Sequence, residues 1–443
     1  MTSALPDVTT PHPRFDRSAA WRADRFGMFI HWGAYAVPAR GEWVRSIERI
    51  TFEDYEPEIE AFVPTEVDFD AWAHLAWNAG MRYAVMTAKH HDGYCLFDSA
   101  LTDYTTVKRG PKRDLVAGFI DAFRRRGLKV GLYFSVIDWA HPDFPHFGDR
   151  QHPMRDNEAF RDHQPDMEAY RAYLHGQVRE ICSNYGQLDV LWFDFSYDEM
   201  TGEAWAASDL IAMVRELQPT AIIDNRLETS GSGHGSLTTD DPLPWAGDFV
   251  SPEQVVPARG IVDPSGRPVP WEACITLNNN WGYAVDDHEW KSSKSVVRKL
   301  VECVAKNGNM LLNVGPDAEG VIPEGSQTVL REVGEWMAVH AESIRGCGAA
   351  GIDKPEWGWY TRNGNTVYAH VFDQPWGPLA LTGIPKERVV SVRNLTTGGE
   401  LEVSSAWSVS AYPDITFVQL GSSDVGTFAL PDDTDTVVEI TLS

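Results

Sequence analysis

The chain has 443 residues, of which 43% are hydrophobic and 23% are charged, and its formal net charge is −26. These proportions are ordinary for a globular protein and exclude a chain that is disordered throughout. The acidic balance argues against nucleic acid and anionic membranes as partners, because both are bound through clustered Lys and Arg. The length suffices for a large catalytic domain and a smaller second domain.

The five cysteines are widely spaced and form no C-x-x-C pair, which is typical of reduced thiols. The first 26 residues lack the apolar core of a signal peptide, and no apolar run approaches the roughly 20 residues of a membrane-spanning helix. We therefore expect a cytoplasmic protein.

Six short apolar runs alternate with helical segments between about residues 25 and 341. Such runs, bounded by Gly and polar residues, are typical of parallel strands buried on both faces. They cover residues 26–31, 83–87, 130–134, 190–194, 221–224 and 310–313. Two further strands, near Asp248 and Trp271, are less clear. The pattern predicts an α/β fold with a (β/α)8-type barrel. A doubly wound sheet also fits the alternation, but no dinucleotide-binding motif follows the first run.

Apolar stripes predict helices over residues 115–123, 167–181 and 297–304, each ending before a glycine. After residue 346 the pattern changes to short β-type runs separated by turns rich in Gly, Pro, Asn and Asp. We therefore predict a barrel domain over residues 1–346 and an antiparallel β-sandwich over residues 347–443.

Polar residues close five of the apolar runs, and the active site of a parallel barrel lies at the carboxyl ends of its strands. One such residue alone is more often a helix cap or a solvated loop residue. Five runs with polar ends on the same face favour a shared site. The residues are His31, His90 with His91, Tyr133, Asp194 and Arg226.

Four segments carry a family resemblance. Residues 26–33 (FGMFIHWG) resemble the first barrel strand of family 29 of the glycoside hydrolases, the α-L-fucosidases. Residues 89–93 (KHHDG), 191–194 (LWFD) and 308–316 (GNMLLNVGP) are similar to that family's double-histidine strand end, nucleophile strand and last barrel strand. The resemblance covers about residues 20–345. It implies a barrel followed by a β-sandwich, a retaining mechanism without metal or other cofactor, and release of L-fucose from fucosylated oligosaccharides or glycoconjugates.

The resemblance makes Asp194 the catalytic nucleophile; read alone, Asp194 could instead cap the next helix. Residues 248–254 (DFVSPEQ) resemble the family's acid/base loop, which favours Glu253 as general acid/base. Glu272 is the main alternative and Asp248 a more distant one. In a retaining enzyme we expect the acid to have a raised pKa and Asp194 a low one, with the two carboxyl groups roughly 5–5.5 Å apart.

The remaining family positions imply a sugar-binding pocket made of His31, Glu42, Trp43, His90, His91, Tyr133, Trp192, Arg226 and Trp281. The resemblance implies that Trp43 lies on the apolar face of the sugar and Trp281 near the fucose methyl group. Other readings are an exposed loop pair for Glu42 and Trp43, an ordinary ion pair for Arg226 and a core ring for Tyr133.

Histidines are also the commonest metal ligands. His90 and His91 are adjacent, so on a regular strand they point to opposite faces and would not chelate one ion without a bend. No H-x-H or H-E-x-x-H motif occurs. Phe195 and Val44 depart from the family, which often has Gly after the nucleophile and an aromatic residue after the Glu-Trp pair.

Three other functions stay open on sequence alone: a related α-L-glycosidase such as an α-L-galactosidase, a non-catalytic carbohydrate-binding protein, and a metal-dependent barrel hydrolase. L-Galactose differs from L-fucose by one hydroxyl, and an apolar pocket rejects an added hydroxyl only about 10²-fold.

Overall fold

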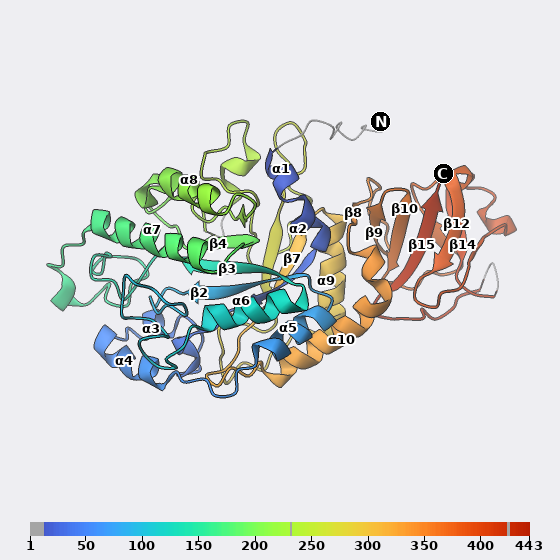
Figure 1. Cartoon of the computed structure of the whole chain (residues 1–443). Helices are drawn as coiled ribbons and strands as arrows, with labels where there is room; N and C mark the ends of the chain where they lie inside the picture. The colour runs from blue at the N-terminus through green and yellow to red at the C-terminus, as the bar shows by residue number, and fades with distance from the viewer. Residues whose placement is uncertain (1–12, 231–232, 423–425) are drawn as a thin grey trace.

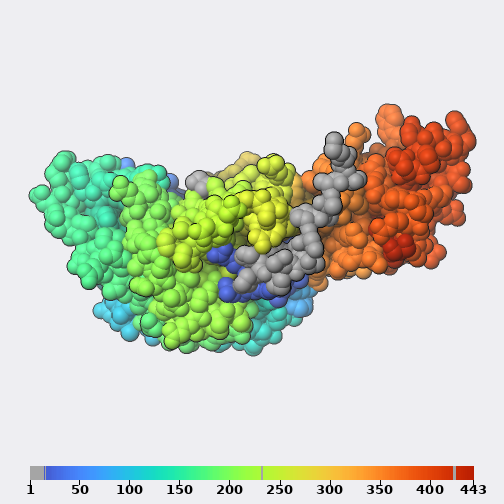
Figure 2. Space-filling model, turned by 90° about the horizontal axis from the view of Figure 1, so that it is seen from above, coloured from blue at the N-terminus to red at the C-terminus, as the bar shows by residue number. Residues whose placement is uncertain are grey.

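The computed structural model describes residues 13–230, 233–422 and 426–443. It contains a parallel sheet surrounded by helices, and a group of antiparallel strands beside helices α9 (Ser293–Ala305) and α10 (Glu324–His340) (Figure 1). Seen from above, the C-terminal part of the chain, drawn orange to red, extends to one side of the larger body (Figure 2). None of the helices in the described ranges combines the length and the apolar character that a membrane span requires.

Seven parallel strands form the first sheet, in the order β5-β4-β3-β2-β1-β7-β6. Each of the six predicted runs coincides with or overlaps one of these strands, and nearly every strand residue is buried, as expected for a sheet covered on both faces. The strands are β1 (Phe26–Ile30), β2 (Tyr83–Lys89), β3 (Lys129–Ser135), β4 (Val190–Asp194), β5 (Ile222–Ile223), β6 (Glu272–Thr276) and β7 (Asn309–Val314).

The less clear strand near Trp271 corresponds to β6, but the one expected near Asp248 does not form. Between β5 and β6 the described chain makes only isolated parallel bridges, which pair Asp224 with Phe249, Val250 with Trp271 and Glu253 with Cys274. Ile223 donates its backbone N–H to the Asp248 carboxylate at 2.9 Å, because the side chain replaces a main-chain acceptor there. The sheet therefore has seven strands, not the eight of the predicted barrel.

Helices α6 (Leu115–Arg126), α7 (Met167–Asn184) and α9 form where the apolar stripes predicted them. In α6, the Asp114 carboxylate accepts the N–H of Ala117 at the start, and Gly127 adopts a left-handed φ of 87° just past the end. The remaining helices of the described chain are α1 (Pro13–Arg17), α2 (Ala19–Asp24), α3 (Val44–Ile47), α4 (Phe52–Ala61), α5 (Phe69–Asn78), α8 (Ala207–Leu217) and α10.

Two antiparallel sheets follow α10, in the orders β12-β15-β10-β9-β8 and β11-β14-β13. The first holds β8 (Gly348–Ala349), β9 (Gly358–Asn363), β10 (Thr366–Val371), β12 (Val389–Asn394) and β15 (Thr436–Leu442). The second holds β11 (Leu379–Leu381), β13 (Glu402–Val403) and β14 (Thr416–Gln419). Both contribute to one apolar core, which agrees with the predicted sandwich. The boundary after residue 346 stays a prediction.

The inner face of the parallel sheet is lined by its own cluster of buried side chains, separate from the core under the helices. Phe29, Trp192 and Cys274 belong to this cluster, on β1, β4 and β6. Because side chains two residues apart share a face, this cluster leads directly to the residues at the strand ends. It forms the floor of the site described next.

Candidate active site

One pocket brings together all eleven residues that the sequence predicted for the site. They come from the carboxyl ends of the strands and from the loops that follow. Their side chains share this pocket with Phe29 and Cys274, which were not predicted, and with Phe195, which stands out in the sequence only as a departure from the family pattern. The eleven are His31, Glu42, Trp43, His90, His91, Tyr133, Trp192, Asp194, Arg226, Glu253 and Trp281.

Asp194 is the last residue of β4 and is 9% exposed. Tyr133 donates its hydroxyl hydrogen to Oδ2 at 2.7 Å, and Arg226 Nη1 lies 3.1 Å from Oδ1. The next helical turn spans Gly202–Trp205 and begins after Thr201, too far along the chain for Asp194 to cap it, so the helix-cap interpretation of Asp194 is wrong. Burial raises the pKa of Asp194 to about 6, Arg226 opposes this rise and Glu253 adds to it. The low pKa expected for this residue is therefore not found in the free enzyme.

Glu253 shares its partner with Asp194, because its Oε2 lies 3.0 Å from the same Arg226 Nη1. The two oxygens that contact this nitrogen lie within about 6 Å of each other, which is compatible with the roughly 5–5.5 Å that separate the carboxyl groups of retaining glycosidases. The Glu253 side chain is 35% exposed, against 12% for Asp194, so solvent reaches it more readily.

The two rival acids lie elsewhere. Glu272 is fully buried below the pocket, where it accepts hydrogen bonds from the Tyr83 hydroxyl and, at 3.4 Å, from Trp192 Nε1; burial raises its pKa to about 7. Asp248 is also fully buried and is neutralised by Arg17 and Arg215 at 2.7 and 2.5 Å. Neither carboxylate lines the pocket that holds Asp194.

Arg226 is held in place on three sides and is 2% exposed. Its Nε donates to Ser251 Oγ at 2.8 Å and its Nη2 to the Ser251 carbonyl oxygen at 3.1 Å. Its guanidinium carbon lies 4.8 Å from the centroid of the Trp192 ring, a cation–π contact. Arg226 is therefore more than an ordinary ion-pair partner, because its rigid guanidinium contacts both carboxylates of the site.

Two histidines of the pocket are fixed in the same tautomer. His31 Nδ1 lies 2.7 Å from Asn313 Oδ1, and the amide nitrogen of Asn313 donates to the Trp281 carbonyl oxygen. His91 Nδ1 lies 2.7 Å from Ser135 Oγ, whose single hydrogen goes to the Ile137 carbonyl oxygen. Nδ1 therefore carries the proton in both rings, which leaves Nε2 as a hydrogen-bond acceptor.

Burial lowers the pKa of His31 to about 3 and the pKa values of His90 and His91 well below their usual range, so all three rings are neutral at pH 7. His90 and His91 both face the pocket, with ring centroids 4.1 Å apart. The expected opposite orientation fails because β2 ends at Lys89, after a break in its register with β3. The described residues contain no group of three or more His, Cys, Asp or Glu side chains arranged to hold a metal ion.

Glu42 and Trp43 are not an exposed loop pair. Glu42 is 6% exposed and accepts the backbone N–H of Gly282 at 2.7 Å, which ties its loop to the one that carries Trp281. Burial raises the pKa of Glu42. The Trp43 ring packs against His91 and Phe195, each with a centroid separation of 5.1 Å. The pocket is thus walled by aromatic rings.

Phe195 adopts a φ of 85°, a left-handed conformation that is unusual for a residue other than glycine. Ser230 Oγ accepts the N–H groups of Phe195 and Ser196 at 3.1 and 2.7 Å and holds this turn. The conformation gives a physical reason for the glycine that the family often has here. In this chain the turn also places the Phe195 ring in the wall of the pocket.

A pair of carboxylates that share one guanidinium at the carboxyl ends of parallel strands, surrounded by aromatic rings and neutral histidines, defines a glycoside hydrolase. The family model for alpha-L-fucosidases matches residues 9–342. The chain belongs to the α-L-fucosidase family. It hydrolyses terminal α-L-fucosides by a retaining double displacement and releases L-fucose from fucosylated glycans.

Individual relatives agree with this assignment. The plasma α-L-fucosidase of Rattus norvegicus is 30% identical over 342 residues, 72% of this chain and 68% of that protein. The structure of α-L-fucosidase isoenzyme 1 from Paenibacillus thiaminolyticus is 56% identical, with a TM-score of 0.93 over 97% of this chain and 99% of that one. A Bacteroides thetaiotaomicron α-L-fucosidase trapped as a covalent intermediate with 2-fluoro-fucosyl fluoride is 27% identical, with a TM-score of 0.80 over 100% and 99% of the two chains.

Proposed function

We propose that Asp194 is the nucleophile and Glu253 the general acid/base of this hydrolysis. In the first step the Asp194 carboxylate attacks the anomeric carbon, and Glu253 gives its proton to the departing glycosidic oxygen. In the second step Glu253 takes a proton from water, whose oxygen attacks the anomeric carbon and breaks the fucosyl–Asp194 ester. Two inversions return the α configuration.

The observation that carries this assignment is the Arg226 Nη1 that contacts both carboxylates. Asp194 receives a second hydrogen bond from Tyr133, whereas Glu253 is more exposed to water. The hydrogen bond from Tyr133 favours the anion on Asp194, and the exposure of Glu253 leaves it within reach of the leaving group and of water. As Asp194 forms its ester bond it loses its charge, and Arg226 then keeps a partner in Glu253, which has become a carboxylate.

The neutral histidines support a role in sugar binding. Nε2 of His31 and of His91 is available to accept hydrogens from fucose hydroxyls, while the rings of Trp43 and Trp281 offer apolar faces. Neutral acceptors suit an uncharged sugar, because they bring no charge that the substrate would have to compensate.

We propose two further points. Residues 249–253 take the place of the eighth strand of a (β/α)8-type barrel, which the bridges from Phe249 to Asp224 and from Val250 to Trp271 support. The enzyme acts in the cytoplasm, without nucleic acid or membrane partners; the five buried free cysteines and the acidic composition are the grounds for this.

Azide rescue separates the roles of the carboxylates. For Glu253→Gly we expect kcat/KM on an unactivated α-L-fucoside to fall about 10²–10⁴-fold. On an aryl α-L-fucoside with a good leaving group, azide should restore turnover and yield the α-fucosyl azide, because two inversions still occur. Asp194→Gly should give the β-fucosyl azide, because azide then attacks the substrate directly in a single inversion.

Glu272→Gln is the matched control, and it should show no response to azide. Rescue of a Glu272 variant together with an unresponsive Glu253→Gly would move the acid/base role to Glu272.

A further inference from the structure

The Arg226 guanidinium has an acceptor for each of its five N–H groups. Nη1 contacts Asp194 Oδ1 and Glu253 Oε2 at 3.1 and 3.0 Å. The edge formed by Nε and Nη2 faces the Ser251 hydroxyl and carbonyl oxygens, at 2.8 and 3.1 Å. The remaining N–H of Nη2 is directed at Cys274 Sγ, a weak acceptor 3.8 Å away. Because the guanidinium is a rigid planar fork, the Ser251 contacts also fix the direction of Nη1.

The Ser251 hydroxyl is itself oriented by Asn225. The backbone nitrogen and the hydroxyl oxygen of Ser251 both lie 3.1 Å from Asn225 Oδ1. Arg226 Nε–H can only donate, so Ser251 Oγ accepts there and gives its one hydrogen to Asn225. The hydrogen bonds therefore run in one fixed sequence, from Arg226 to Ser251 and from Ser251 to Asn225.

This sequence joins the two loops that carry the charged groups of the site. Asn225 precedes Arg226 in the loop after β5, and Ser251 lies two residues before Glu253. Between β5 and β6 the described chain forms only isolated bridges. The Asn225 side chain thus supplies a link between neighbouring segments that ladder hydrogen bonds supply elsewhere in the sheet.

Asn225 and Ser251 act without touching the sugar pocket. They are 2% and 3% exposed, and neither belongs to the lining of the pocket that holds Asp194. Loss of either side chain would therefore remove no contact to the substrate. Its effect on the reaction would pass through Arg226 and the segment that carries Glu253.

We propose that Asn225 and Ser251 are positioning residues, which hold the Arg226 guanidinium and the Glu253 segment at the distance from Asp194 that the double displacement requires. The proposal rests on the proposed roles of Asp194 and Glu253. Positioning of this kind has a large effect on rate, because a displacement of about 1 Å can slow a reaction about 10²-fold.

Two truncations test the proposal. Ser251→Ala removes the acceptor of Arg226 Nε but keeps the backbone bond to Asn225, whereas Asn225→Ala releases both Ser251 groups. For an aryl α-L-fucoside we expect kcat to fall about tenfold in Ser251→Ala and further in Asn225→Ala, with KM within about twofold of the wild type. If Asn225→Ala does not fold, Ser251→Ala decides the question.

The pH profile separates positioning from a general loss of stability. Burial raises the pKa of Asp194, and Arg226 opposes this rise. A guanidinium that is no longer held should oppose it less, so the acidic limb of kcat/KM should move to higher pH in both variants. Glu253, Tyr133 and Asp224, which also interact with Asp194, are unchanged in these variants.

A double-mutant cycle tests whether the effect passes through Arg226. In the Arg226→Met background the hydrogen bonds to Ser251 are already lost. Ser251→Ala should then lower kcat/KM less than about twofold further. If the two losses multiply instead, Ser251 acts by another route and the proposal is overturned.

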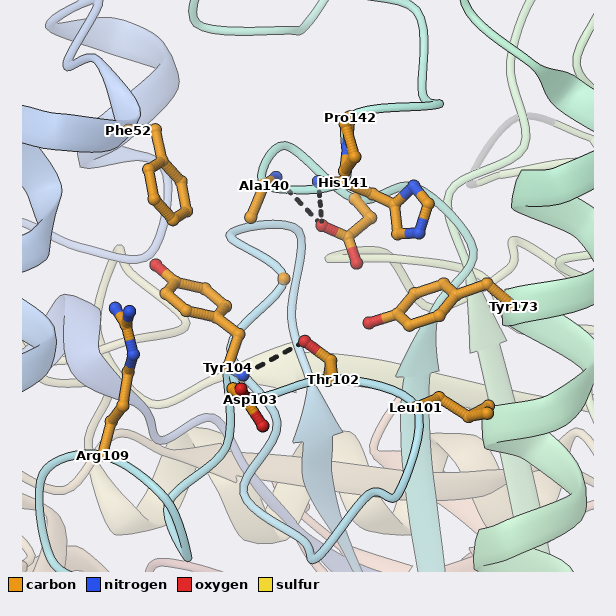
Figure 3. A pocket seen from close by; sticks show the side chains of 12 residues that line it. Phe52, Leu101, Thr102, Asp103, Tyr104, Arg109, Ala140, His141, Pro142 and Tyr173 are labelled. Carbon is orange, nitrogen blue, oxygen red and sulfur yellow. Dashed lines mark hydrogen bonds between the residues drawn. The ribbon is translucent and has the colours of Figure 1, made fainter.

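Two matched controls remove comparable groups elsewhere. Thr102→Val removes a side-chain oxygen that accepts the Tyr104 backbone N–H at 3.1 Å, in a loop that lines a separate cavity (Figure 3). Ser343→Ala removes a fully buried hydroxyl that donates to the His340 carbonyl oxygen. Both may lose stability, but kcat and the acidic limb should stay at the wild-type values.

The proposal is also overturned if Ser251→Ala keeps the wild-type kcat and acidic limb, or if a control variant shifts the limb equally. Labelling of the wild type with 2-fluoro-fucosyl fluoride separates this failure from failure of the proposed function. A label on Asp194 with an unaffected Ser251→Ala contradicts the positioning role alone. A label on another residue contradicts the proposed function.

Discussion

Arg226 Nη1 lies 3.1 Å from Asp194 Oδ1, and both side chains are buried at the end of the parallel sheet. A carboxylate in this position is strongly desolvated, so burial alone favours its protonated form. The guanidinium opposes that effect but does not cancel it, and the pKa of Asp194 stays at about 6. The nucleophile is therefore ionised at pH 7, although its pKa lies only about one unit lower.

This balance predicts the acidic limb of the pH profile. Because the pKa of Asp194 is raised, the enzyme should lose activity at a higher pH than an ordinary carboxylate would cause. We expect kcat/KM for an aryl α-L-fucoside to fall below an apparent pKa of about 6, a value that belongs to the coupled pair of acids. A limb near pH 4 would contradict the buried environment described for Asp194.

Substitution of Arg226 should move that limb. Arg226→Met removes the cation that lowers the pKa of Asp194, so the acidic limb should shift upward and kcat/KM at pH 7 should fall by about 10²-fold or more. Arg226→Lys keeps the charge but loses the two contacts to Ser251. Its kcat/KM and the position of its acidic limb should lie between those of Arg226→Met and the wild type.

Arg215→Met is the control for this series. Arg215 pairs with Asp248 outside the pocket, so its loss should lower stability but leave the acidic limb in place. An Arg226→Met profile that superimposes on the wild-type profile would refute the electrostatic role of Arg226.

Phe195 allows the strain after the nucleophile to be measured. Its φ of 85° suits glycine, so Phe195→Gly should be more stable than Phe195→Ala by about 1 kcal/mol, although both remove the ring. Urea unfolding of the two variants gives the difference directly, because the packing lost is nearly the same. Equal stabilities would show that the turn carries no strain.

Strand ends were the part of the site most open to prediction from sequence. The residues at the carboxyl end of a buried parallel strand lie at the edge of the sheet, so His31, Tyr133 and Asp194 could be predicted from where the apolar runs stop. Phe29 and Cys274 show the limit of this kind of prediction. Both read as ordinary core residues, although Phe29 shares a strand face with His31, and that alternation was the available signal.

Features that depend on loops were harder to predict. Glu253 and Glu272 both lie near a predicted strand, and only the fold reveals that one faces the pocket while the other is buried beneath it. Where an eighth strand was expected, the chain forms only isolated bridges, and the Asp248 carboxylate accepts the Ile223 N–H in place of a main-chain oxygen.

Covalent labelling tests the central claim most directly. The enzyme is inactivated with 2-fluoro-fucosyl fluoride and digested, and the modified peptide is sequenced by mass spectrometry. We predict a single fucosyl ester on Asp194, its formation slowed in Tyr133→Phe because the hydroxyl that contacts Oδ2 is lost. A label on any other residue, or inactivation without a covalent adduct, would contradict the account.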